Sequence, residues 1–355
     1  MAKPVDGRYA IVDKIGEGGM QQVFSARDRL LDKLVALKIP KNESAVKRFE
    51  RSAQMSARVN NRNVAKTLDY IDEGDTNYLI EELVEGLDLS AVLDFFPLGI
   101  DPYSVARALH QIAAGVSASH DREVVHRDLK PSNVMVADGI RMRSFKITDF
   151  GIAKMAEAEL DEAVEGGDQS LTASQTAIGA LPYMSPEMIA SVKDASFPTD
   201  IWSVGAMAYE LLSGKKPFGS GLKAVSKIEK GVYERDVAQL RKQQFKPLGE
   251  ALLAIIDRCL QVDQKKRPTA GELVSLCEEL CYNDDDRLLG DVTVFSYNSW
   301  GFIAAEDGRS VFFHRDSIYG KSSLSVGDEV LFAAYRGGGS DRAFPVLPVK
   351  RAPGK

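Results

Sequence analysis

Two carboxylates, an asparagine and a lysine stand in the order that transfer of a phosphoryl group would need. The segment VVHRDLKPSNVMV carries Asp128 and Asn133 on one expected loop, and ITDFG supplies a second carboxylate, Asp149. Far upstream, VALKI places Lys38 on an expected strand. This reaction needs a carboxylate to orient the attacking hydroxyl, oxygen ligands to hold Mg²⁺ and a lysine to steady the phosphates. The four residues match those tasks.

A glycine-rich stretch, GEGGMQQVF at residues 16–24, lies shortly before that lysine, between the apolar runs YAIVDKI and KLVALKI. Taken alone, it fits a nucleotide clamp or a flexible hairpin turn equally well, because glycine-rich turns join strands in every class of fold. A lid of backbone N–H groups over the phosphates is the remaining part that the chemistry requires. Four fragments in this order and context therefore favour the clamp.

The elements that would position these residues change in type along the chain. From Arg8 to about Ile80 the pattern predicts short alternating strands, interrupted by one helix in SAVKRFERSAQMSARV, and from about Leu89 the apolar period becomes 3.6. Beyond Leu289, five short runs with glycine-rich turns predict a small closed β-barrel. The expected fold class is α+β, with a two-lobed domain at 8–282 (lobes at about 8–84 and 85–282), a polar linker at 283–288 and a five-stranded barrel at 289–350.

Composition excludes some classes of function. The chain has 355 residues and a formal net charge of -6, which argues against nonspecific nucleic-acid binding by the chain as a whole. No window approaches the roughly 18 consecutive apolar residues that a membrane span requires, and the N-terminal MAKPVDGRY lacks the apolar region of a signal peptide. We therefore expect a cytoplasmic protein with no membrane partner.

These segments resemble the eukaryotic-like protein kinase family, and particularly its bacterial serine/threonine members, from about Arg8 to Tyr282. The segments SPE, DIWSVG and KKRPT add to the resemblance. It implies a bilobal kinase fold, ATP and Mg²⁺ as cofactors, and a protein substrate with a serine or threonine acceptor. It also implies an ion pair between Arg267 and Glu187.

Carried over residue by residue, the resemblance gives each position a role. Asp128 is the catalytic base, Lys130 steadies the transferred phosphoryl group, and Lys38 holds the α- and β-phosphates. Asn133 and Asp149 bind Mg²⁺. The lid, the walls of the adenine pocket and the hinge backbone that would hold ATP are formed by Ile15, Gly16, Glu17, Gly18, Gly19, Val23, Ala36, Glu82, Val84 and Met135.

Four positions depart from the family pattern. Gln21 replaces the third lid glycine, Ala180 replaces the usual threonine of the substrate-docking loop, and the residue before the hinge is the charged Glu81. Ser52 stands where the helix of the first lobe carries the glutamate that pairs with Lys38. Without that glutamate, Lys38 is free to pair with the ITDFG carboxylate in competition with Mg²⁺. We therefore expect a weak or conditionally active kinase, with a pseudokinase scaffold as the alternative.

The segment between ITDFG and SPE is long and acidic, and its QSLTASQT stretch carries four hydroxyl side chains. Ser170, Thr172, Ser174 and Thr176 are candidate phosphorylation sites, and Arg127 would be the partner of a phosphate there. The alternative is that these hydroxyls only solvate a loop.

The C-terminal region from about residue 289 to residue 349 resembles a cold-shock domain, a barrel of the OB type. SWGFI and VFFH correspond to its two RNA-binding strand motifs, which places the implied base-stacking positions at Trp300, Phe302, Phe312 and His314. The implied partner is single-stranded RNA or DNA. The alternative is that these side chains fill the barrel core, or form an apolar patch for a protein partner or for the kinase lobe.

Overall fold

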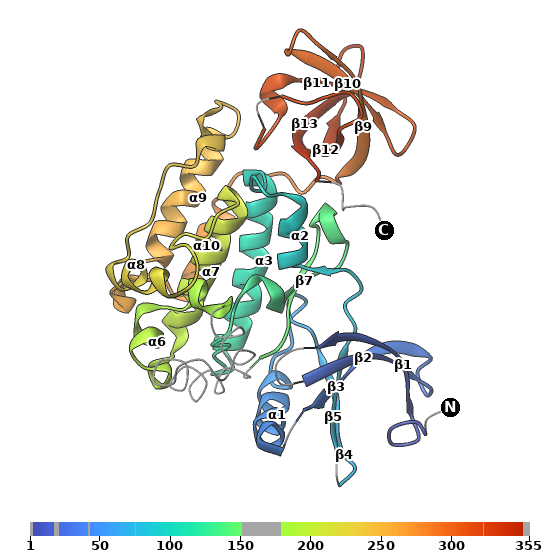
Figure 1. The fold of residues 1–355 in the computed structure, drawn as a ribbon, viewed down its shortest axis with the longest axis vertical. Coiled ribbons are helices and arrows are strands. Elements are labelled where there is room, and N and C mark those ends of the chain that lie inside the picture. Colours follow the sequence, from blue (N-terminus) through green and yellow to red (C-terminus); the bar gives the residue numbers. More distant parts are fainter. Residues whose placement is uncertain are drawn as a thin grey trace.

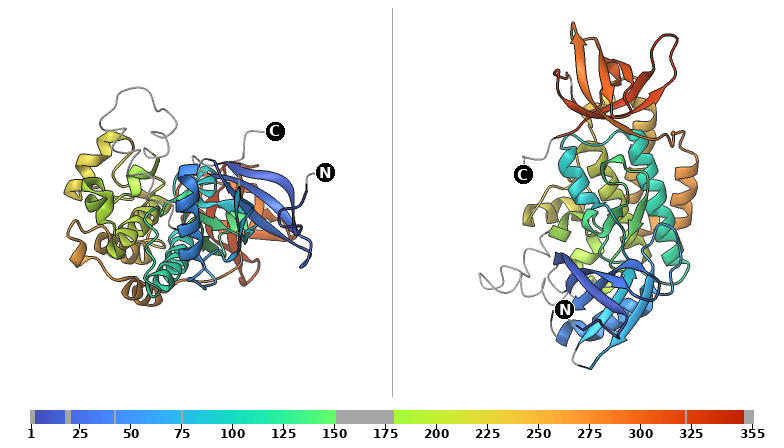
Figure 2. Two further views of the ribbon diagram at one scale, coloured as in Figure 1. Left: turned by 90° about the horizontal axis from the view of Figure 1, so that it is seen from below. Right: turned by 90° about the vertical axis from the view of Figure 1, so that its right-hand side faces the viewer.

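The computed structural model describes residues 3–17, 21–41, 43–74, 76–150, 179–321 and 323–350. They form three parts that lie in a line, with the β-barrel at the end opposite the N-terminal lobe (Figures 1 and 2). The α+β class and the C-terminal five-stranded barrel that the sequence predicts are both confirmed. Within the described ranges, no helix is long and apolar enough to cross a lipid bilayer.

The N-terminal lobe is an antiparallel five-stranded sheet in the order β1-β2-β3-β5-β4, with helix α1 packed beside it. Val35 and Leu37 of β3 are buried in its small apolar core. Because side chains alternate along a strand, Ala36 and Lys38 point to the opposite face of the sheet. The elements span Tyr9–Glu17 (β1), Gln21–Asp28 (β2), Lys33–Pro40 (β3), Glu43–Ser56 (α1), Thr67–Asp72 (β4) and Asn77–Glu82 (β5).

The C-terminal lobe is mostly helical and contains the largest apolar core. Asp101 caps α3 by accepting hydrogen bonds from the backbone N–H groups of Tyr103 and Ser104, and Gly214 ends α7 with a φ of 72°. The helices span Leu89–Phe95 (α2), Pro102–His120 (α3), Pro186–Ala190 (α6), Phe197–Ser213 (α7), Val225–Lys230 (α8), Lys246–Cys259 (α9) and Ala270–Glu278 (α10). A small sheet consists of Leu87–Asp88 (β6), Val134–Val136 (β7) and Phe145–Ile147 (β8).

The C-terminal barrel closes in the order β10-β11-β13-β12-β9. Its interior is apolar and includes Ile303, Val311 and Phe313. Gly301 of the SWGFI segment is required by close packing, since a Cβ there would lie 2.0 Å from the Val294 carbonyl oxygen. The strands span Leu288–Ser296 (β9), Trp300–Ala305 (β10), Ser310–His314 (β11), Glu329–Tyr335 (β12) and Arg342–Pro348 (β13), so the first begins one residue before the expected boundary.

The barrel packs directly on the C-terminal lobe. The Tyr319 hydroxyl donates a 2.7 Å hydrogen bond to the Leu212 carbonyl in the last turn of α7. The Tyr319 ring lies edge-on to Phe245, the residue before α9, at 5.0 Å between centroids. Arg287 forms an ion pair of 3.1 Å with Asp101, and both side chains are buried. Side chains of the barrel therefore extend the core of the lobe, which makes the barrel a docked part of the structure.

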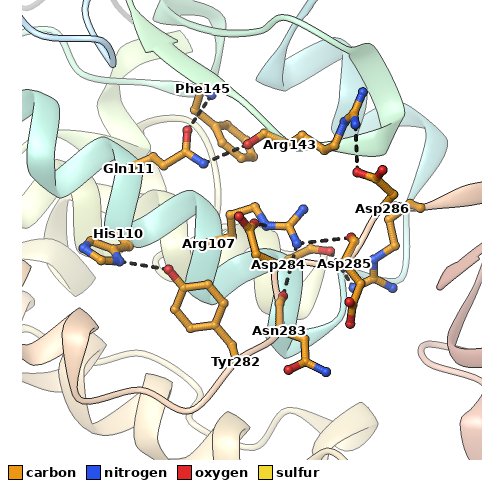
Figure 3. A network of polar contacts seen from close by, with 12 residues as sticks. Arg107, His110, Gln111, Arg143, Phe145, Tyr282, Asn283, Asp284, Asp285 and Asp286 are labelled. Atoms are coloured by element: carbon orange, nitrogen blue, oxygen red, sulfur yellow. Dashed lines mark hydrogen bonds and ion pairs between the residues drawn. The ribbon is translucent and has the colours of Figure 1, made fainter. Parts of the chain in front are cut away.

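The polar segment that the sequence predicts as a linker is held at several points (Figure 3). Arg107 of α3, which is 2% exposed, donates to the backbone carbonyls of Asn283 and Asp285 at 3.1 and 3.3 Å. Each aspartate side chain also has a different partner: Asp284 pairs with Arg107 at 2.6 Å, Asp285 accepts from the Tyr335 hydroxyl at 2.6 Å, and Asp286 pairs with Arg143 at 2.7 Å. The segment therefore joins the two domains with its backbone and side chains anchored to both.

Candidate active site

The loop that carries Asp128 is fixed by a buried carboxylate, Asp200, in the first turn of α7. The two Asp200 oxygens accept hydrogen bonds of 2.8 Å from the backbone N–H groups of His126 and Arg127. Arg127 has a φ of 69°, a conformation that is unfavourable for a residue with a side chain and must be held by its surroundings. Asp200 thus fixes the backbone immediately before Asp128. Sequence reasoning gave Asp200 no role, although a carboxylate at the start of the apolar run DIWSVGAMAYELL was a usable signal.

Asp128, Lys130 and Asn133 contact one another within this loop. Lys130 Nζ lies 2.8 Å from Asp128 Oδ2 and 3.1 Å from Oδ1. Asn133 Nδ2 donates to the Asp128 carbonyl oxygen at 2.8 Å and to its Oδ2 at 3.1 Å. Because the amide nitrogen of Asn133 faces Asp128, its amide oxygen is the atom that remains for a cation.

Asp149 reaches the same place because β7 and β8 are antiparallel neighbours. Val134 at the start of β7 pairs with Ile147 at the end of β8, and the Thr148 backbone N–H donates to the Asn133 carbonyl at 2.9 Å. Asp149, which comes next, has a φ of 62°. The hairpin therefore places Asn133 and Asp149, the two predicted Mg²⁺ ligands, close together at the same end of strands β7 and β8.

The Asp149 carboxylate, which belongs to the C-terminal lobe, accepts hydrogen bonds from two side chains of the N-terminal lobe. Its Oδ1 lies 2.8 Å from Lys38 Nζ and 2.8 Å from Gln21 Nε2. Burial disfavours the charged carboxylate, but the Lys38 charge and these hydrogen bonds outweigh that effect and hold the pKa of Asp149 below its usual value. Gln21, which replaces the third lid glycine, is therefore a direct partner of this carboxylate.

Lys38 has a second carboxylate partner that sequence reasoning missed. The expected pairing with Asp149 is present, and Lys38 Nζ also lies 2.5 Å from Glu81 Oε2 of β5. Burial disfavours the Lys38 ammonium, but the two adjacent carboxylates outweigh this and raise its pKa above the usual value. Burial also raises the pKa of Glu81, against the opposing effect of the Lys38 charge. Ser52 instead donates from its hydroxyl to the Phe150 carbonyl.

The remaining predicted ATP-binding residues are distributed over both lobes. Ala36 is buried and pairs with Glu81 across β3 and β5, and Met135 lies half-buried on β7. The carboxylates of two of them already have lysine partners: Glu82 pairs with Lys146 at 2.7 Å, and Glu17 pairs with Lys41 at 2.6 Å. Ile15 and Gly16 lie on β1, Val23 on β2 opposite Lys38, and Val84 just after β5. Gly18, Gly19, Ser170, Thr172, Ser174 and Thr176 lie outside the described residues.

The predicted ion pair between Arg267 and Glu187 is present. Two guanidinium nitrogens of Arg267 lie 2.6 and 2.8 Å from the two Glu187 oxygens, and the Arg267 side chain is fully buried. The guanidinium also lies 5.0 Å from the ring of Trp202 in α7. This bidentate pair fixes the segment after the candidate substrate-docking loop to the core of the lobe.

The four predicted base-stacking residues share one face of the barrel. Trp300 pairs with His314, and Phe302 pairs with Phe312, across β10 and β11. The Trp300, Phe302 and Phe312 ring centroids are 5.8 to 6.4 Å apart. The idea that these rings fill the core is wrong, since Trp300 is 37% exposed and the alternate residues of both strands form the core. Strands β10 and β11 lie on the side of the barrel away from the helices of the C-terminal lobe (Figure 1).

Comparison with known proteins agrees with this arrangement. Residues 9–276 match the model of the protein kinase domain, and residues 288–349 match that of the 'cold-shock' DNA-binding domain. A probable serine/threonine-protein kinase of Clostridium perfringens is 31% identical over 288 residues, which is 79% of this chain and 39% of the relative. The serine/threonine-protein kinases pkn3 of Myxococcus xanthus and PrkC of Bacillus subtilis are each 33% identical, over 77% and 64% of this chain and 49% and 33% of their own lengths.

This chain therefore spans less than half the length of these curated relatives. The kinase-domain match nevertheless covers most of the chain, and it includes the contacting residues Asp128, Asn133, Asp149 and Lys38. The protein thus belongs to the protein kinase family, and a cold-shock domain follows its kinase domain.

Proposed function

We propose that this protein transfers the γ-phosphoryl group of ATP to serine or threonine hydroxyls of protein substrates. The observation that carries the proposal is the continuous contact of the required groups. Lys130 and Asn133 contact Asp128, Asn133 is joined to the β8 end that carries Asp149, and Asp149 contacts Lys38. A pseudokinase scaffold would have no need of all these groups in mutual reach.

In this proposal, Asp128 accepts the proton of the substrate hydroxyl as its oxygen attacks the γ-phosphorus and the bond to the β-phosphate oxygen breaks. Asp128 Oδ1 accepts only one hydrogen bond among the described residues, at 3.1 Å from Lys130, so it retains capacity for the substrate. Lys130, which contacts Asp128 before the reaction, would then pair with the negative charge on the transferred phosphoryl group. Lys38 would hold the α- and β-phosphates of the departing ADP.

The residues present fit Mg²⁺, which would neutralise the charge of the phosphates. Asn133 offers an amide oxygen and Asp149 a carboxylate whose lowered pKa keeps it ionised at neutral pH. Within the described part of the chain, no group of three or more His, Cys, Asp and Glu side chains could hold a metal alone. This agrees with Mg²⁺ chemistry, because Mg²⁺ in kinases takes one or two protein ligands and completes its shell with phosphate oxygens and water.

Transfer of labelled phosphate from ATP to a generic basic protein tests the proposal directly. We expect incorporation by the full-length protein with Mg²⁺, and its near loss in Asp128→Asn. Asp194→Asn, which changes an exposed aspartate of the same lobe, is the control and should retain activity. A wild-type protein that binds ATP without transferring phosphate, or an Asp128→Asn variant as active as wild type, would favour the scaffold alternative.

The barrel supports a second proposed function, the binding of single-stranded RNA or DNA. Its exposed Trp300 stands beside the half-buried Phe302 and Phe312, and the docking surface for the kinase lobe is made of other residues, such as Tyr319 and Phe344. Each stacked base contributes roughly 1–3 kcal/mol, so two or three rings suffice for weak binding. Basic and acidic residues nearly balance from Gly290 onwards, so affinity should change only mildly with salt.

Titration of the full-length protein with a fluorescent oligo-pyrimidine at two salt concentrations tests this second function. The double change of Trp300 and Phe312 to alanine should remove binding at both concentrations. Val326→Ala is a matched control, because Val326 is an apolar side chain 67% exposed elsewhere on the barrel. Absence of binding by the wild type would leave the aromatic face as a surface for a protein partner.

A further inference from the structure

The buried pair between Lys38 and Glu81 is the strongest feature that the family pattern does not explain. Lys38 is 5% exposed and Glu81 is 5% exposed, and their charged atoms are 2.5 Å apart. A buried charge without a partner costs several kcal/mol, so each of these groups depends on the other. Ser52, at the position of the usual glutamate, contacts the Phe150 carbonyl and supplies no charge.

The register of the sheet explains how the two side chains meet. Across β3 and β5, Lys38 pairs with Leu79 and Ala36 pairs with Glu81. Residues 36, 38, 79 and 81 therefore share one face, and Lys38 and Glu81 are diagonal neighbours on it. Diagonal neighbours lie within reach of long side chains, so backbone hydrogen bonds between adjacent strands hold the pair together.

We infer that Glu81 is the positioning residue of Lys38 and replaces the helix glutamate that Ser52 lacks. The inference rests on the proposed kinase function and adds a statement about its regulation. In the family pattern, the lysine and its glutamate belong to a strand and a helix, so movement of the helix makes or breaks the pair. Here both groups belong to one sheet, and displacement of α1 does not separate them.

The Glu81 carboxylate also reduces the expected competition between Lys38 and Mg²⁺ for Asp149. If Asp149 were the sole partner of Lys38, turning Asp149 towards a cation would leave a buried ammonium unpaired. With Glu81 at 2.5 Å, Lys38 keeps a carboxylate whichever way Asp149 turns. The departure at Ser52 therefore does not by itself make the enzyme weak.

If the absence of the helix glutamate alone weakened the enzyme, restoring it at position 52 would raise activity; this inference predicts the opposite for the wild type. In the wild-type background, Ser52→Glu would place a third carboxylate beside a single buried ammonium, and the added charge would be repelled by Glu81 and Asp149. In a Glu81→Gln background, the same change would supply the partner that Lys38 has lost. One substitution should thus impair the wild type and rescue the variant.

The experiment measures kcat and KM for ATP, ATP affinity without turnover, and thermal unfolding for wild type, Glu81→Gln, Ser52→Glu and the double variant. Because a small displacement of a positioning group costs on the order of 100-fold, we expect Glu81→Gln to lower kcat/KM for ATP by roughly that factor. The double variant should regain most of the loss. Asp28→Asn is the control: Asp28 is a 1%-exposed carboxylate of the same lobe, paired with Arg8 at 2.7 Å, and its loss should lower stability without changing KM for ATP.

Three outcomes separate the possibilities. Phosphate transfer by wild type that Glu81→Gln leaves unchanged would overturn the inference and leave the proposed kinase function intact. An inactive wild type would instead refute the kinase function. ATP affinity would then test the role of Glu81, since this affinity should fall in Glu81→Gln and recover in the double variant. If Glu81→Gln does not fold, Glu81→Asp keeps the charge with a shorter reach, and unchanged kcat/KM and ATP affinity in that folded variant would also contradict the inference.

Discussion

Replacing Tyr319 with phenylalanine tests whether the cold-shock domain and the kinase domain unfold as one unit. Leu212 lies in the last turn of α7, where carbonyl groups have no partner within the helix. The Tyr319 hydroxyl supplies a partner from the barrel at 2.7 Å, and this side chain is 1% exposed. Burial raises the pKa of Tyr319 well above its usual value, so the hydroxyl remains a donor throughout the neutral pH range.

The Tyr319→Phe change keeps the ring against Phe245 and removes only the hydroxyl. A buried carbonyl that loses its hydrogen bond costs about 1–3 kcal/mol. Domain unfolding free energies are roughly 5–15 kcal/mol, so the loss is a measurable fraction. Because donor and acceptor belong to different domains, we expect both domains to become less stable.

The chain carries one tryptophan in each domain, Trp202 in α7 and Trp300 in β10, and these two are its full complement. Urea unfolding followed by fluorescence, with Trp300→Phe as the reporter of Trp202 alone, separates the two signals. We expect one shared midpoint, which Tyr319→Phe lowers for both. Tyr297→Phe is the matched control, since Tyr297 is 94% exposed on the same barrel. Different midpoints in the wild type, or an unchanged Trp202 transition in Tyr319→Phe, would refute the coupling.

The remaining predictions concern charged groups. Lys38→Met should abolish phosphate transfer and also lower the melting temperature, because it leaves two buried carboxylates unpaired; a variant as stable as wild type would contradict the second part. Hydrogen bonds and charge from Arg267 outweigh burial and hold the pKa of Glu187 below its usual value. The ionised Glu187 therefore stabilises the folded protein fully above about pH 4.3, the pKa of a glutamate in the unfolded chain. This stabilisation is lost as pH falls through the lower pKa that Glu187 has in the folded protein. The stability difference between wild type and Glu187→Gln in urea should therefore be largest near pH 7 and shrink below pH 4. Arg107→Ala should lower the free energy of unfolding by roughly 3 kcal/mol, because two hydrogen bonds to backbone carbonyls are lost. Arg143→Ala, which removes a half-exposed ion pair, should lower it by less than about 1 kcal/mol. Equal losses of stability in the two variants would contradict this.

The grouping of the candidate catalytic residues was predictable because phosphoryl transfer restricts the residue types and their order along the chain. Asp128, Asn133, Asp149 and Lys38 could be selected without knowledge of any contact, and the structure brings them together. Glu81 could not be assigned in this way. Alternation along NYLIEE places it on one face with Leu79, but its role depends on which strand lies beside β3. The observed order β1-β2-β3-β5-β4 is set by packing, and no local pattern specifies it.

The docking of the barrel was unpredictable for a related reason. The aspartates of residues 284–286 have the composition of a solvated linker, and Arg107, which holds the backbone of this segment, lies 176 residues from Asn283 along the chain. Tyr319 lies between β11 and β12, outside any helix or strand, where no periodicity marks it as buried. A ligand on the Trp300 face could alter the kinase site only by binding two arrangements of this interface with different affinity. Because buried contacts such as the Tyr319–Leu212 hydrogen bond stabilise a single arrangement, any coupling between barrel and kinase site must act through changes at that interface.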